Sequence, residues 1–472
     1  MASYARHAGI AYNPRPKPKA EKTMRSLSQI AARLDAGEPS RALIDECIER
    51  IKDPAGEGDQ VFLKVYGEAA RTAADAFDQL RRRDATPSPY AGVPIAVKDL
   101  FDVAGDVTTA GSVALRQAPA ATRDAPTIAR MRAAGFVPIG RTNMTEFAFS
   151  GLGINPHYGT PRNPYDRKTG RIPGGSSSGS AVAVTDGMAM AALGSDTGGS
   201  CRIPAALCGI VGFKPTAQRV PTAGTMPLSQ TLDSIGPMAA TVACCAVLDA
   251  VLAGEPPVAE APFPVEGLRF AVPQTLVLDG MDKEVAAAFS AALTRLSGAG
   301  ARIVEIPLRE LSELAQVNAK GGFPAAEAYA VHRPLIKVKG KEYDPFVLSR
   351  IERGKEQEAA DYIELQWARE EMIRRLAAIT APFDALVMPT VPIIAPTFRG
   401  LANPDTARAA NLLLLRNPSI ANFFDRCAIS IPCHKAGDAP AGLMLISETG
   451  ADRRLLAIAA GVEKLVSPAV GE

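Results

Sequence analysis

The chain has 472 residues, of which 47% are hydrophobic and 22% are charged, and its formal net charge is +2. This composition is typical of a soluble globular enzyme, and the near-neutral charge excludes a broad electrostatic attraction to nucleic acid or to an acidic membrane surface. The length would accommodate about three domains of ordinary size, although large α/β proteins also fold as one domain.

The chain shows no pattern of export or membrane insertion. Residues 1–22 are rich in proline, lysine and arginine and lack the apolar core of a signal peptide, so we expect a flexible N-terminal segment. The longest apolar runs, 181–194 and 239–254, each contain an aspartate and are too short and too polar to cross a bilayer. The seven scattered cysteines form no CxxC pair, which favours reduced core residues over disulfides. These features predict a cytoplasmic protein without a membrane partner.

The N-terminal part alternates predicted helices with short apolar strands. The helical region 26–51 has Ser26 or Ser28 as its N-cap and a break near Gly37-Glu38-Pro39. The next elements are a helix over 69–83 with a solvated Arg81-Arg82-Arg83 face, a strand over 93–97, a helix over 125–134 and a strand over 136–140. The irregular, glycine- and proline-rich segment 144–166 is expected to form the wall of a site.

The same alternation continues in the C-terminal part. We predict a buried helix over 237–254, a strand over 268–272, a helix over 284–296, a strand over 302–306, helices over 311–379 with breaks at Pro334 and Pro345, strands over 385–389, 428–431 and 442–447, and a helix over 451–465. No repeat and no clear linker interrupts this order. The sequence therefore predicts one large α/β domain over 23–472, with a central mixed, mostly parallel sheet covered by helices on both faces.

Two glycine–serine turns, 174–180 and 198–200, lie in the stretch 173–216. Glycines packed this densely let backbone N–H groups approach a ligand closely. The run 175–179 formally fits the G-x-S-x-G nucleophile elbow, but no apolar strand directly precedes it, and the downstream histidines, His332 and His434, are not in site-like contexts. The G-K-[ST] of a phosphate loop and an S-x-x-K motif are absent.

Lys98, at the end of the predicted strand 93–97, offers a different partner for these serines. A serine hydrolase can use a neutral lysine as its base. The ordinary lysine pKa near 10.4 must then fall by about three units, which burial at a strand end can supply. The apolar neighbours in Val97-Lys98-Asp99-Leu100-Phe101 favour such burial over an exposed surface position.

Several segments together resemble the amidase signature family. They are GVPIAVKDLFDVAG (92–105), GRTNMTEFAFSG (140–151), GGSSSGSAVAV (174–184), GSDTGGSCRIPAALCGIVGFKPT (194–216), LDSIGPMA (232–239), and a weaker match through 441–448 and 453–460. The similarity covers most of the chain from Gly92 onward. Cys201 departs from the aliphatic residue usual in the family, and its thiol suggests sensitivity to thiol reagents.

The resemblance implies a Ser–Ser–Lys triad. Ser200 would be the acylated nucleophile, Ser176 the bridging serine held through a cis peptide bond, and Lys98 the base. The backbone N–H groups of Thr197, Gly198, Gly199 and Ser200 would form the oxyanion hole.

Family position also suggests residues around the triad. Asn143 and Ala148, together with Ser176, would bind the substrate. Asp196 and Arg202 would fix the loop around the nucleophile. Ser177, Ser178 and Ser180 are expected to be turn and helix-cap residues rather than nucleophiles.

The resemblance implies a stand-alone amidase that converts a small carboxamide to a carboxylate plus ammonia or an amine, without a metal or a cofactor. Some phrases are similar to indoleacetamide hydrolases, and a homodimer is an expected assembly. The alternative is the amidase component of a tRNA-dependent amidotransferase. Those components usually read Lys-Asp-Asn and Arg-Gln-Pro where this chain has Lys98-Asp99-Leu100 and Arg202-Ile203-Pro204.

Overall fold

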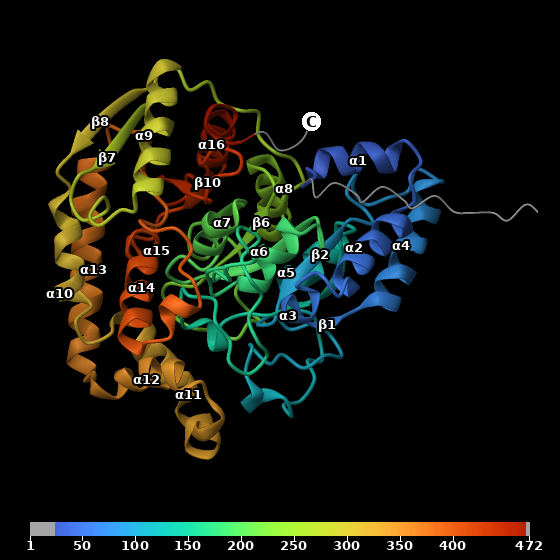
Figure 1. The fold of residues 1–472 in the computed structure, drawn as a ribbon, viewed down its shortest axis with the longest axis horizontal. Coiled ribbons are helices and arrows are strands. Elements are labelled where there is room, and N and C mark those ends of the chain that lie inside the picture. The colour runs from blue at the N-terminus through green and yellow to red at the C-terminus, as the bar shows by residue number, and fades with distance from the viewer. Residues whose placement is uncertain (1–23, 469–472) are drawn as a thin grey trace, which may run out of the picture.

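An eleven-stranded mixed sheet runs through the described residues, 24–468, of the computed structural model (Figure 1). In spatial order its strands are β1 (Phe62–Val65), β3 (Val137–Thr142), β2 (Pro94–Lys98), β4 (Ala191–Asp196), β6 (Ser234–Ala239), β5 (Val211–Lys214), β10 (Ala428–Pro432), β11 (Gly442–Ile446), β9 (Ala385–Pro389), β7 (Arg269–Pro273) and β8 (Arg302–Ile306). The predicted flexible segment 1–22 lies outside the described residues.

The sheet is mixed, as predicted, but the expectation that it is mostly parallel is wrong. Parallel pairing joins β2 to β3 and β4, and β7 to β8 and β9. The other pairings, β1–β3, β4–β6, β5–β6, β5–β10, β10–β11 and β9–β11, are antiparallel. Within the described chain no helix separates β5 from β6 or β10 from β11. Consecutive strands joined in this way pair antiparallel, because a parallel return needs a long crossover.

Helices flank the sheet. They are α1 (Leu27–Asp35), α2 (Ser40–Lys52), α3 (Gly58–Val61), α4 (Gly67–Arg81), α5 (Pro126–Ala133), α6 (Ser178–Thr185), α7 (Arg202–Cys208), α8 (Val242–Ala253), α9 (Lys283–Gly298), α10 (Leu314–Val317), α11 (Gly322–Lys339), α12 (Pro345–Glu352), α13 (Ala359–Thr380), α14 (Pro404–Arg416), α15 (Pro418–Phe423) and α16 (Asp452–Val466). Every residue of the central strands β2, β4, β5, β6, β10 and β11 is buried, so both faces of the sheet are covered.

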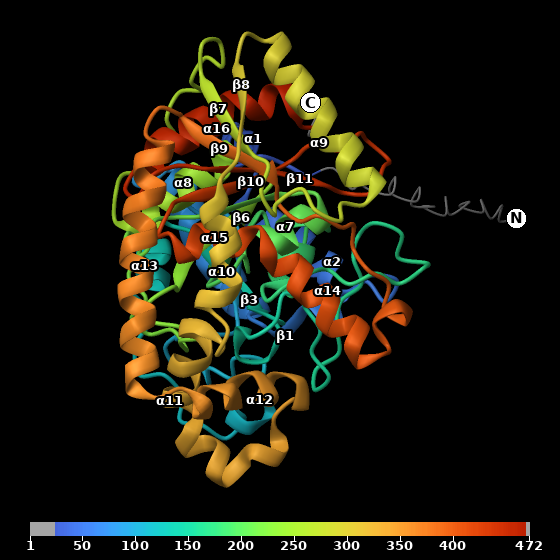
Figure 2. The ribbon, with the colours of Figure 1, turned by 90° about the vertical axis from the view of Figure 1, so that its left-hand side faces the viewer.

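The long helix α13 runs along one side of the molecule (Figures 1 and 2). Helices α11 and α12 lie together at one end of the molecule in both views. Among the helices of residues 24–468, none combines the length and the apolar composition needed to cross a bilayer.

Most predicted elements are confirmed within a few residues. The region 26–51 forms two helices, and the Ser26 hydroxyl accepts a hydrogen bond from the Gln29 amide as an N-cap. Pro334 does not break a helix, since it lies inside α11, whereas Pro345 begins α12. Proline is tolerated at the position of Pro345 because the N–H groups of a first helical turn have no partner within the helix.

The main error concerns the region around the glycine–serine turns. The predicted helix 237–254 is the end of strand β6 followed by helix α8, which Thr241 caps by accepting from the Cys244 amide. Strands β4 and β5 were not predicted. β4 reads AALGSD and lacks the β-branched and aromatic residues that usually signal a strand, whereas β5 is only four residues long.

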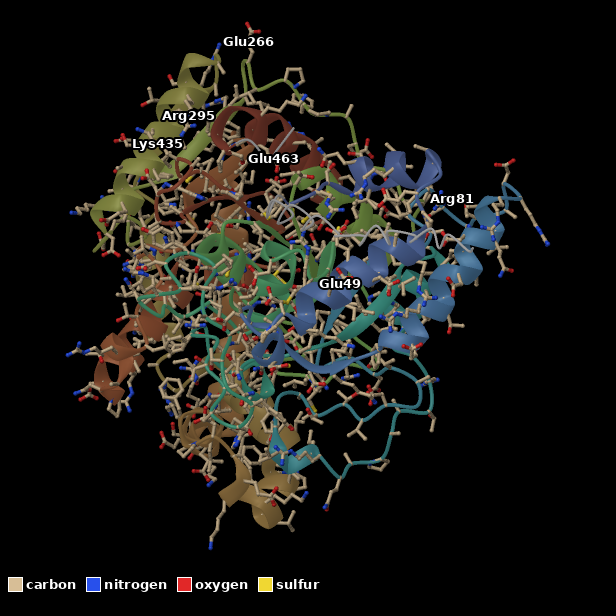
Figure 3. All side chains as sticks on the ribbon, turned by 45° about the vertical axis from the view of Figure 1, so that its right-hand side comes forward. Glu49, Arg81, Glu266, Arg295, Lys435 and Glu463 are labelled. Carbon is tan, nitrogen blue, oxygen red and sulfur yellow. The ribbon has the colours of Figure 1, made fainter. Side chains whose placement is uncertain are left out.

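Hydrogen bonds of charged side chains join neighbouring helices, and Figure 3 labels two of these side chains, Arg81 and Glu463. Arg81 donates to the Asp35 carboxylate at 2.8 Å and to the Ala91 carbonyl at 2.8 Å, while Arg82 and Arg83 are exposed as predicted. Glu463 of α16 accepts from the Val242 amide at the start of α8, at 2.9 Å, and burial raises the pKa of its carboxyl to about 7.

Candidate active site

Lys98 is the last residue of β2 and is completely buried. Its Nζ lies 2.8 Å from Ser176 Oγ and 2.8 Å from Ser195 Oγ. Burial lowers the pKa of Lys98 to about 8, against the opposing influence of Cys201, Asp196 and Asp233. Lys98 is therefore an amine that is held in place and is partly neutral near physiological pH.

Ser195 was missed by the sequence analysis. It lies in β4, the parallel neighbour of β2, with Val97 opposite Leu193. Recognising 191–196 as a strand beside 94–98 would have placed the Ser195 hydroxyl near Lys98.

Ser176 occupies the turn that leads into α6, and the Gly175–Ser176 peptide bond is cis, as the family resemblance implied. The Thr145 amide donates to the Ser176 carbonyl at 3.1 Å, which fixes this turn against the 144–153 segment. A Cβ at Gly175 would lie 2.5 Å from the Gly153 nitrogen, so only glycine fits there.

Ser200 lies in the second turn, between β4 and α7, and its side chain borders a cavity of about 340 Å³. Asp196 holds this turn by accepting from the Gly199 amide at 2.8 Å and the Cys201 amide at 3.1 Å. Arg202 forms a fully buried ion pair with Asp196 at 2.8 Å. Although burial alone would raise the pKa of Asp196, the Arg202 guanidinium keeps it well below its ordinary value. Asp196 and Arg202 thus fix the loop, as expected.

The backbone N–H groups around Ser200 differ in whether they are free to donate a hydrogen bond to a ligand. In the described chain, no residue accepts a hydrogen bond from the amides of Thr197, Gly198 or Ser200, and these three residues border the cavity. Gly199 does not border the cavity, and its amide is used by Asp196. The expectation that Gly199 contributes to the oxyanion hole is therefore corrected, because its N–H points to a buried carboxylate.

The two serine turns lie against each other through their backbones. The Ser177 amide donates to the Ser200 carbonyl at 3.3 Å. Within residues 24–468, no hydrogen bond joins the side chains of Ser176 and Ser200. The structure thus forms the Lys98–Ser176 contact and places Ser200 in the adjoining turn.

The cavity wall agrees only in part with the sequence prediction. Ala148, Phe149 and Ser150 border the cavity, so Ala148 lies where it was expected. Asn143 does not. Its side-chain amide donates to the carbonyls of Gln60 and Gly159, both at 2.9 Å, and its oxygen accepts from the Met144 amide. The prediction of Asn143 as a substrate-binding residue is therefore wrong, because its polar atoms hold backbone together.

The remaining cavity-lining residues come from several distant segments. They are Thr197, Gly198, Ser200, Leu228, Leu232, Leu276, Leu314, Ala315, Asn318, Gly321, Pro324, Arg350, Leu412, Leu415, Arg416, Ser419 and Phe423. Most come from the C-terminal helices, where no local motif marks them. Sequence reasoning missed Arg350 and Arg416 among them.

Other candidate nucleophiles and bases lie away from this cavity. Ser177, Ser178 and Ser180 are buried and do not border it. None of the described histidines borders it either, and His332 contacts the Tyr343 hydroxyl instead.

Cys201 is completely buried, with its thiol pKa raised by burial, so the expected sensitivity to thiol reagents is not supported. All seven cysteines are free and buried, as predicted.

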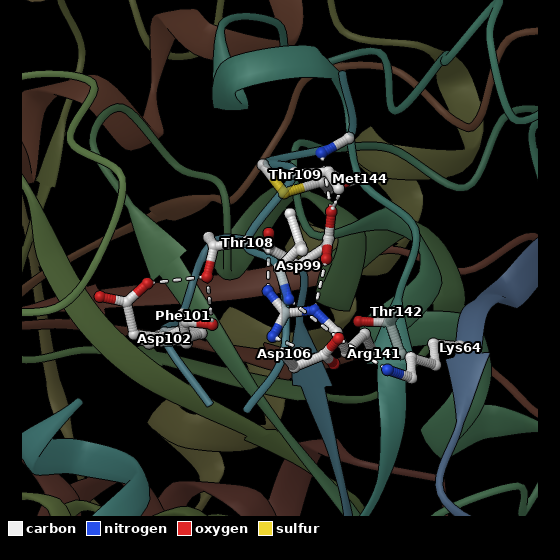
Figure 4. A network of polar contacts seen from close by, with 12 residues as sticks. Lys64, Asp99, Phe101, Asp102, Asp106, Thr108, Thr109, Arg141, Thr142 and Met144 are labelled. Carbon is white, nitrogen blue, oxygen red and sulfur yellow. Dashed lines mark hydrogen bonds and ion pairs between the residues drawn. The ribbon is translucent and has the colours of Figure 1, made fainter. Parts of the chain in front are cut away.

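A buried ionic network fixes the chain directly after Lys98 (Figure 4). Arg141 of β3 donates to the Asp99 carboxylate at 2.5 Å and to the Asp99 carbonyl at 3.2 Å. The other Asp99 oxygen accepts from the Gly111 amide and the Thr109 hydroxyl. Asp106 extends the network by accepting from Lys64 at 2.7 Å. This network explains why an aspartate follows Lys98 and why an arginine lies near the end of β3.

We expect Arg141→Ala to destabilise the protein by about 3–5 kcal/mol, because the substitution leaves the Asp99 carboxylate buried without its partner. Urea unfolding followed by circular dichroism measures the change. The matched control is Arg374→Ala, which removes an exposed partner of Glu371 and should cost under about 1 kcal/mol. Equal effects of the two substitutions would contradict a structural role for the network.

Comparison with known proteins agrees with this architecture. The sequence profile of the Amidase family matches residues 42–456. A 2-amino-5-chloromuconic acid deaminase of Comamonas testosteroni is 37% identical over 452 residues, covering 93% of this chain and 96% of the relative. A Glutamyl-tRNA(Gln) amidotransferase component of Chloroflexus aggregans is 34% identical over 473 residues, covering 92% of this chain and 94% of the relative.

The fold is also that of a known amidase structure. A crystal structure described as an amidase superimposes with a TM-score of 0.84 at 31% identity, covering 94% of this chain and all of that one. With a family profile over most of its length and relatives that match nearly end to end, this chain belongs to the amidase signature family of enzymes that hydrolyse carbon–nitrogen bonds.

Proposed function

We propose that this protein hydrolyses a carboxamide to a carboxylate plus ammonia or an amine, through an acyl-enzyme on Ser200. One observation carries the proposal. A buried lysine of lowered pKa contacts Ser176, and the adjoining turn presents Ser200 and three amides, unpaired within the described chain, to a cavity. These are the parts that acyl transfer needs: a nucleophile, a base and donors for an oxyanion.

The proposed reaction begins with proton transfer. Neutral Lys98 takes the Ser200 proton through Ser176 while Ser200 Oγ attacks the amide carbonyl carbon. The second link, between Ser176 and Ser200, forms when substrate is bound, since catalytic hydrogen bonds often tighten only in the complex. The amides of Thr197, Gly198 and Ser200 stabilise the negative oxygen of the tetrahedral intermediate.

The same relay then runs in reverse. The Lys98 ammonium returns its proton through Ser176 to the leaving nitrogen, because an amide nitrogen leaves poorly as an anion. Water then attacks the carbonyl carbon of the Ser200 ester and gives a proton to the relay. The relay passes this proton to Ser200 Oγ as the bond between Oγ and the acyl carbon breaks, and the released acid ionises to the carboxylate. Ser195, the second contact of Lys98, keeps the amine directed at Ser176.

The alternative function is that of the amidase component in a tRNA-dependent amidotransferase, and one of the relatives belongs to that class. Leu100 and Ile203, at positions where that class usually has asparagine and glutamine, favour a stand-alone enzyme. We take a small amide as the substrate and the cytoplasm as the location, with a homodimer as the assembly to test by light scattering.

Ammonia release by the purified chain alone, across a panel of amides, ureas and esters, tests the proposed function. Turnover of at least one amide without partner proteins supports it. Ammonia release that requires charged tRNA and partner proteins would establish the alternative instead.

We expect the acylation rate to rise with pH, to be half-maximal near pH 8 and to reach a plateau above about pH 9. Protonated Lys98 cannot accept a proton, so activity falls as pH decreases through its pKa of about 8. At pH 7 about one tenth of the enzyme has the neutral amine. Single-turnover rates from pH 6 to 10 measure this profile. His434→Gln is the control and should leave the profile unchanged, whereas loss of the inflection in that variant would indicate a Ser–His site.

A further inference from the structure

Thr197 and Asp233 face each other where two neighbouring strands end. Strands β4 and β6 pair antiparallel, and their last paired residues on this side are Asp196 and Ser234. Thr197, directly after β4, and Asp233, directly before β6, therefore continue the same ladder. The Thr197 hydroxyl donates a hydrogen bond to Asp233 Oδ1. This contact joins the nucleophile loop (residues 197–201, between β4 and α7) to the start of β6.

The other oxygen of Asp233 holds the loop that precedes β6. Asp233 Oδ2 accepts hydrogen bonds from the backbone N–H groups of Leu228 at 3.0 Å and Ser229 at 3.1 Å. The Asp233 N–H in turn donates to the Ser229 carbonyl at 2.8 Å. Leu228 borders the cavity beside the nucleophile loop, as Thr197 does. One carboxylate therefore fixes both the nucleophile loop and a part of the cavity wall.

The hydrogen bonds that the Asp233 carboxylate accepts within residues 24–468 all come from neutral donors, a hydroxyl and two N–H groups. Glu327 of α11 fixes the same loop from its other side, by accepting from the Ser229 hydroxyl and, at 3.1 Å, from the Thr231 N–H. Burial, with the negative charge of Glu327, raises the pKa of Asp233 to about 6, against the opposing effect of its hydrogen bonds. Asp233 is therefore mostly ionised at neutral pH and both of its oxygens can accept.

We propose that Asp233 is a positioning residue for the oxyanion hole: through the Thr197 hydroxyl, it keeps the Thr197 N–H directed at the oxygen that becomes negative in the tetrahedral intermediate. This inference rests on the proposed function. Thr197 is buried at the cavity, and no residue of the described chain accepts a hydrogen bond from its N–H. An oxyanion donor is effective when its direction is fixed before the charge develops. The side-chain hydrogen bond to Asp233 restricts rotation of the Thr197 backbone and so fixes that direction.

Two substitutions of Asp233 separate its hydrogen bonds from its charge. Asp233→Ala removes both acceptor oxygens, and kcat should fall about 100-fold with KM within about threefold, since the loss of one oriented oxyanion donor costs about 10²- to 10³-fold. Asp233→Asn keeps the shape, because its oxygen accepts from the loop N–H groups and its NH2 group donates to the Thr197 oxygen. This variant should therefore keep kcat within about tenfold of the wild type. Equal losses for the two variants would contradict positioning through hydrogen bonds.

A double-mutant cycle tests the coupling between Asp233 and Thr197. Thr197→Val has nearly the same shape and lacks the hydroxyl, so it should lower kcat about as much as Asp233→Ala does. The double variant should lose little more than either single variant, because both substitutions break the same link. Effects that multiply, to about 10⁴-fold in the double variant, would overturn the proposal.

Asp249→Ala is the matched control. Asp249, in α8, is another buried aspartate whose carboxyl pKa burial raises to about 6, and it does not border the cavity. Its partner Arg219 still contacts the Glu255 carboxylate, at 2.9 Å, when Asp249 is removed. Turnover per folded molecule, with the folded fraction taken from circular dichroism, should stay within about threefold of the wild type. A loss equal to that of Asp233→Ala would contradict a specific role of Asp233.

Labelling of Ser200 separates this inference from the proposed function, because phosphonylation uses the oxyanion hole but needs no amide. A fluorophosphonate should label Asp233→Ala about 100-fold more slowly than the wild type, and Asp233→Asn within about tenfold of it. If amides are hydrolysed and Asp233→Ala matches the wild type in both assays, the positioning role is wrong while amide hydrolysis stands. If no amide is hydrolysed but Asp233→Ala slows the labelling of Ser200, the positioning role is supported and the proposed function fails.

Discussion

Replacing Ser200 by alanine should reduce amide turnover by about five powers of ten or more while leaving the fold intact. The loss is large because the hydroxyl forms the covalent intermediate, and nucleophile deletions in serine hydrolases have effects of this size. The fold should survive because the side chain borders the cavity rather than filling the core. Steady-state ammonia release and circular dichroism measure the two quantities.

Ser177→Ala is the control for this substitution. Ser177 is equally a serine of the glycine-rich region, but it is buried and does not border the cavity. Its Oγ lies 3.5 Å from the Ser195 carbonyl oxygen. The variant should keep turnover within about tenfold of the wild type, since it loses at most a weak hydrogen bond. A larger loss for Ser177→Ala than for Ser200→Ala would contradict the assignment of the nucleophile.

Replacing Lys98 by alanine should lower the rate of amide hydrolysis by about 10³- to 10⁴-fold, the upper range for a general acid–base group. Ester hydrolysis should fall less, because an alkoxide or phenoxide leaves with less help from a proton than an amine does. Parallel assays of one amide and its matching ester give the ratio. Equal losses for both would mean that Lys98 does not protonate the leaving group.

Lys214 provides a matched control for Lys98. It is a second buried lysine, at the end of β5, and burial likewise lowers its pKa to about 8. Its amine donates to the Pro215 carbonyl at 2.6 Å, and it does not border the cavity. Lys214→Met should therefore leave the chemical step of the folded enzyme unchanged. A loss comparable to that of Lys98→Ala, measured per folded molecule, would show that burial of any lysine matters rather than its contact with Ser176.

The two glycine–serine turns and Lys98 could be singled out from sequence because their surroundings are local, and the family resemblance then implied Ser176 and Ser200 as the triad serines. The glycines of 174–180 and 198–200 shape turns that few other residues can form, and Lys98 follows directly on an apolar strand. The structure places Lys98 in contact with Ser176 and places Ser200 in the adjoining turn, at the cavity. The roles of these residues remain the proposal that the experiments above test.

Features that depend on tertiary packing could not be predicted in this way. Asn143 lies in a matching segment, but its orientation toward Gln60 and Gly159 depends on how separate loops pack around it. The same holds for the Gly199 amide, which donates a hydrogen bond to Asp196, and Asp196 is in turn paired with the buried Arg202.

The strand directions and the cavity wall were missed for a related reason. The short, alanine-rich β4 has no periodic signal, so neither its pairing with β2 nor the contact of Ser195 with Lys98 was apparent. Arg350 lies 150 residues after Ser200 in an ordinary amphipathic helix, and only the packing of α12 brings it to the same cavity.

The most direct test of the central claim, that Ser200 becomes acylated, is covalent labelling followed by peptide mapping. A fluorophosphonate should add one adduct per chain to the wild-type enzyme, and tandem mass spectrometry should locate it on Ser200. The Ser200→Ala protein should remain unlabelled. An adduct on Ser177, or labelling that persists in Ser200→Ala, would contradict the account and favour a nucleophile in the first turn.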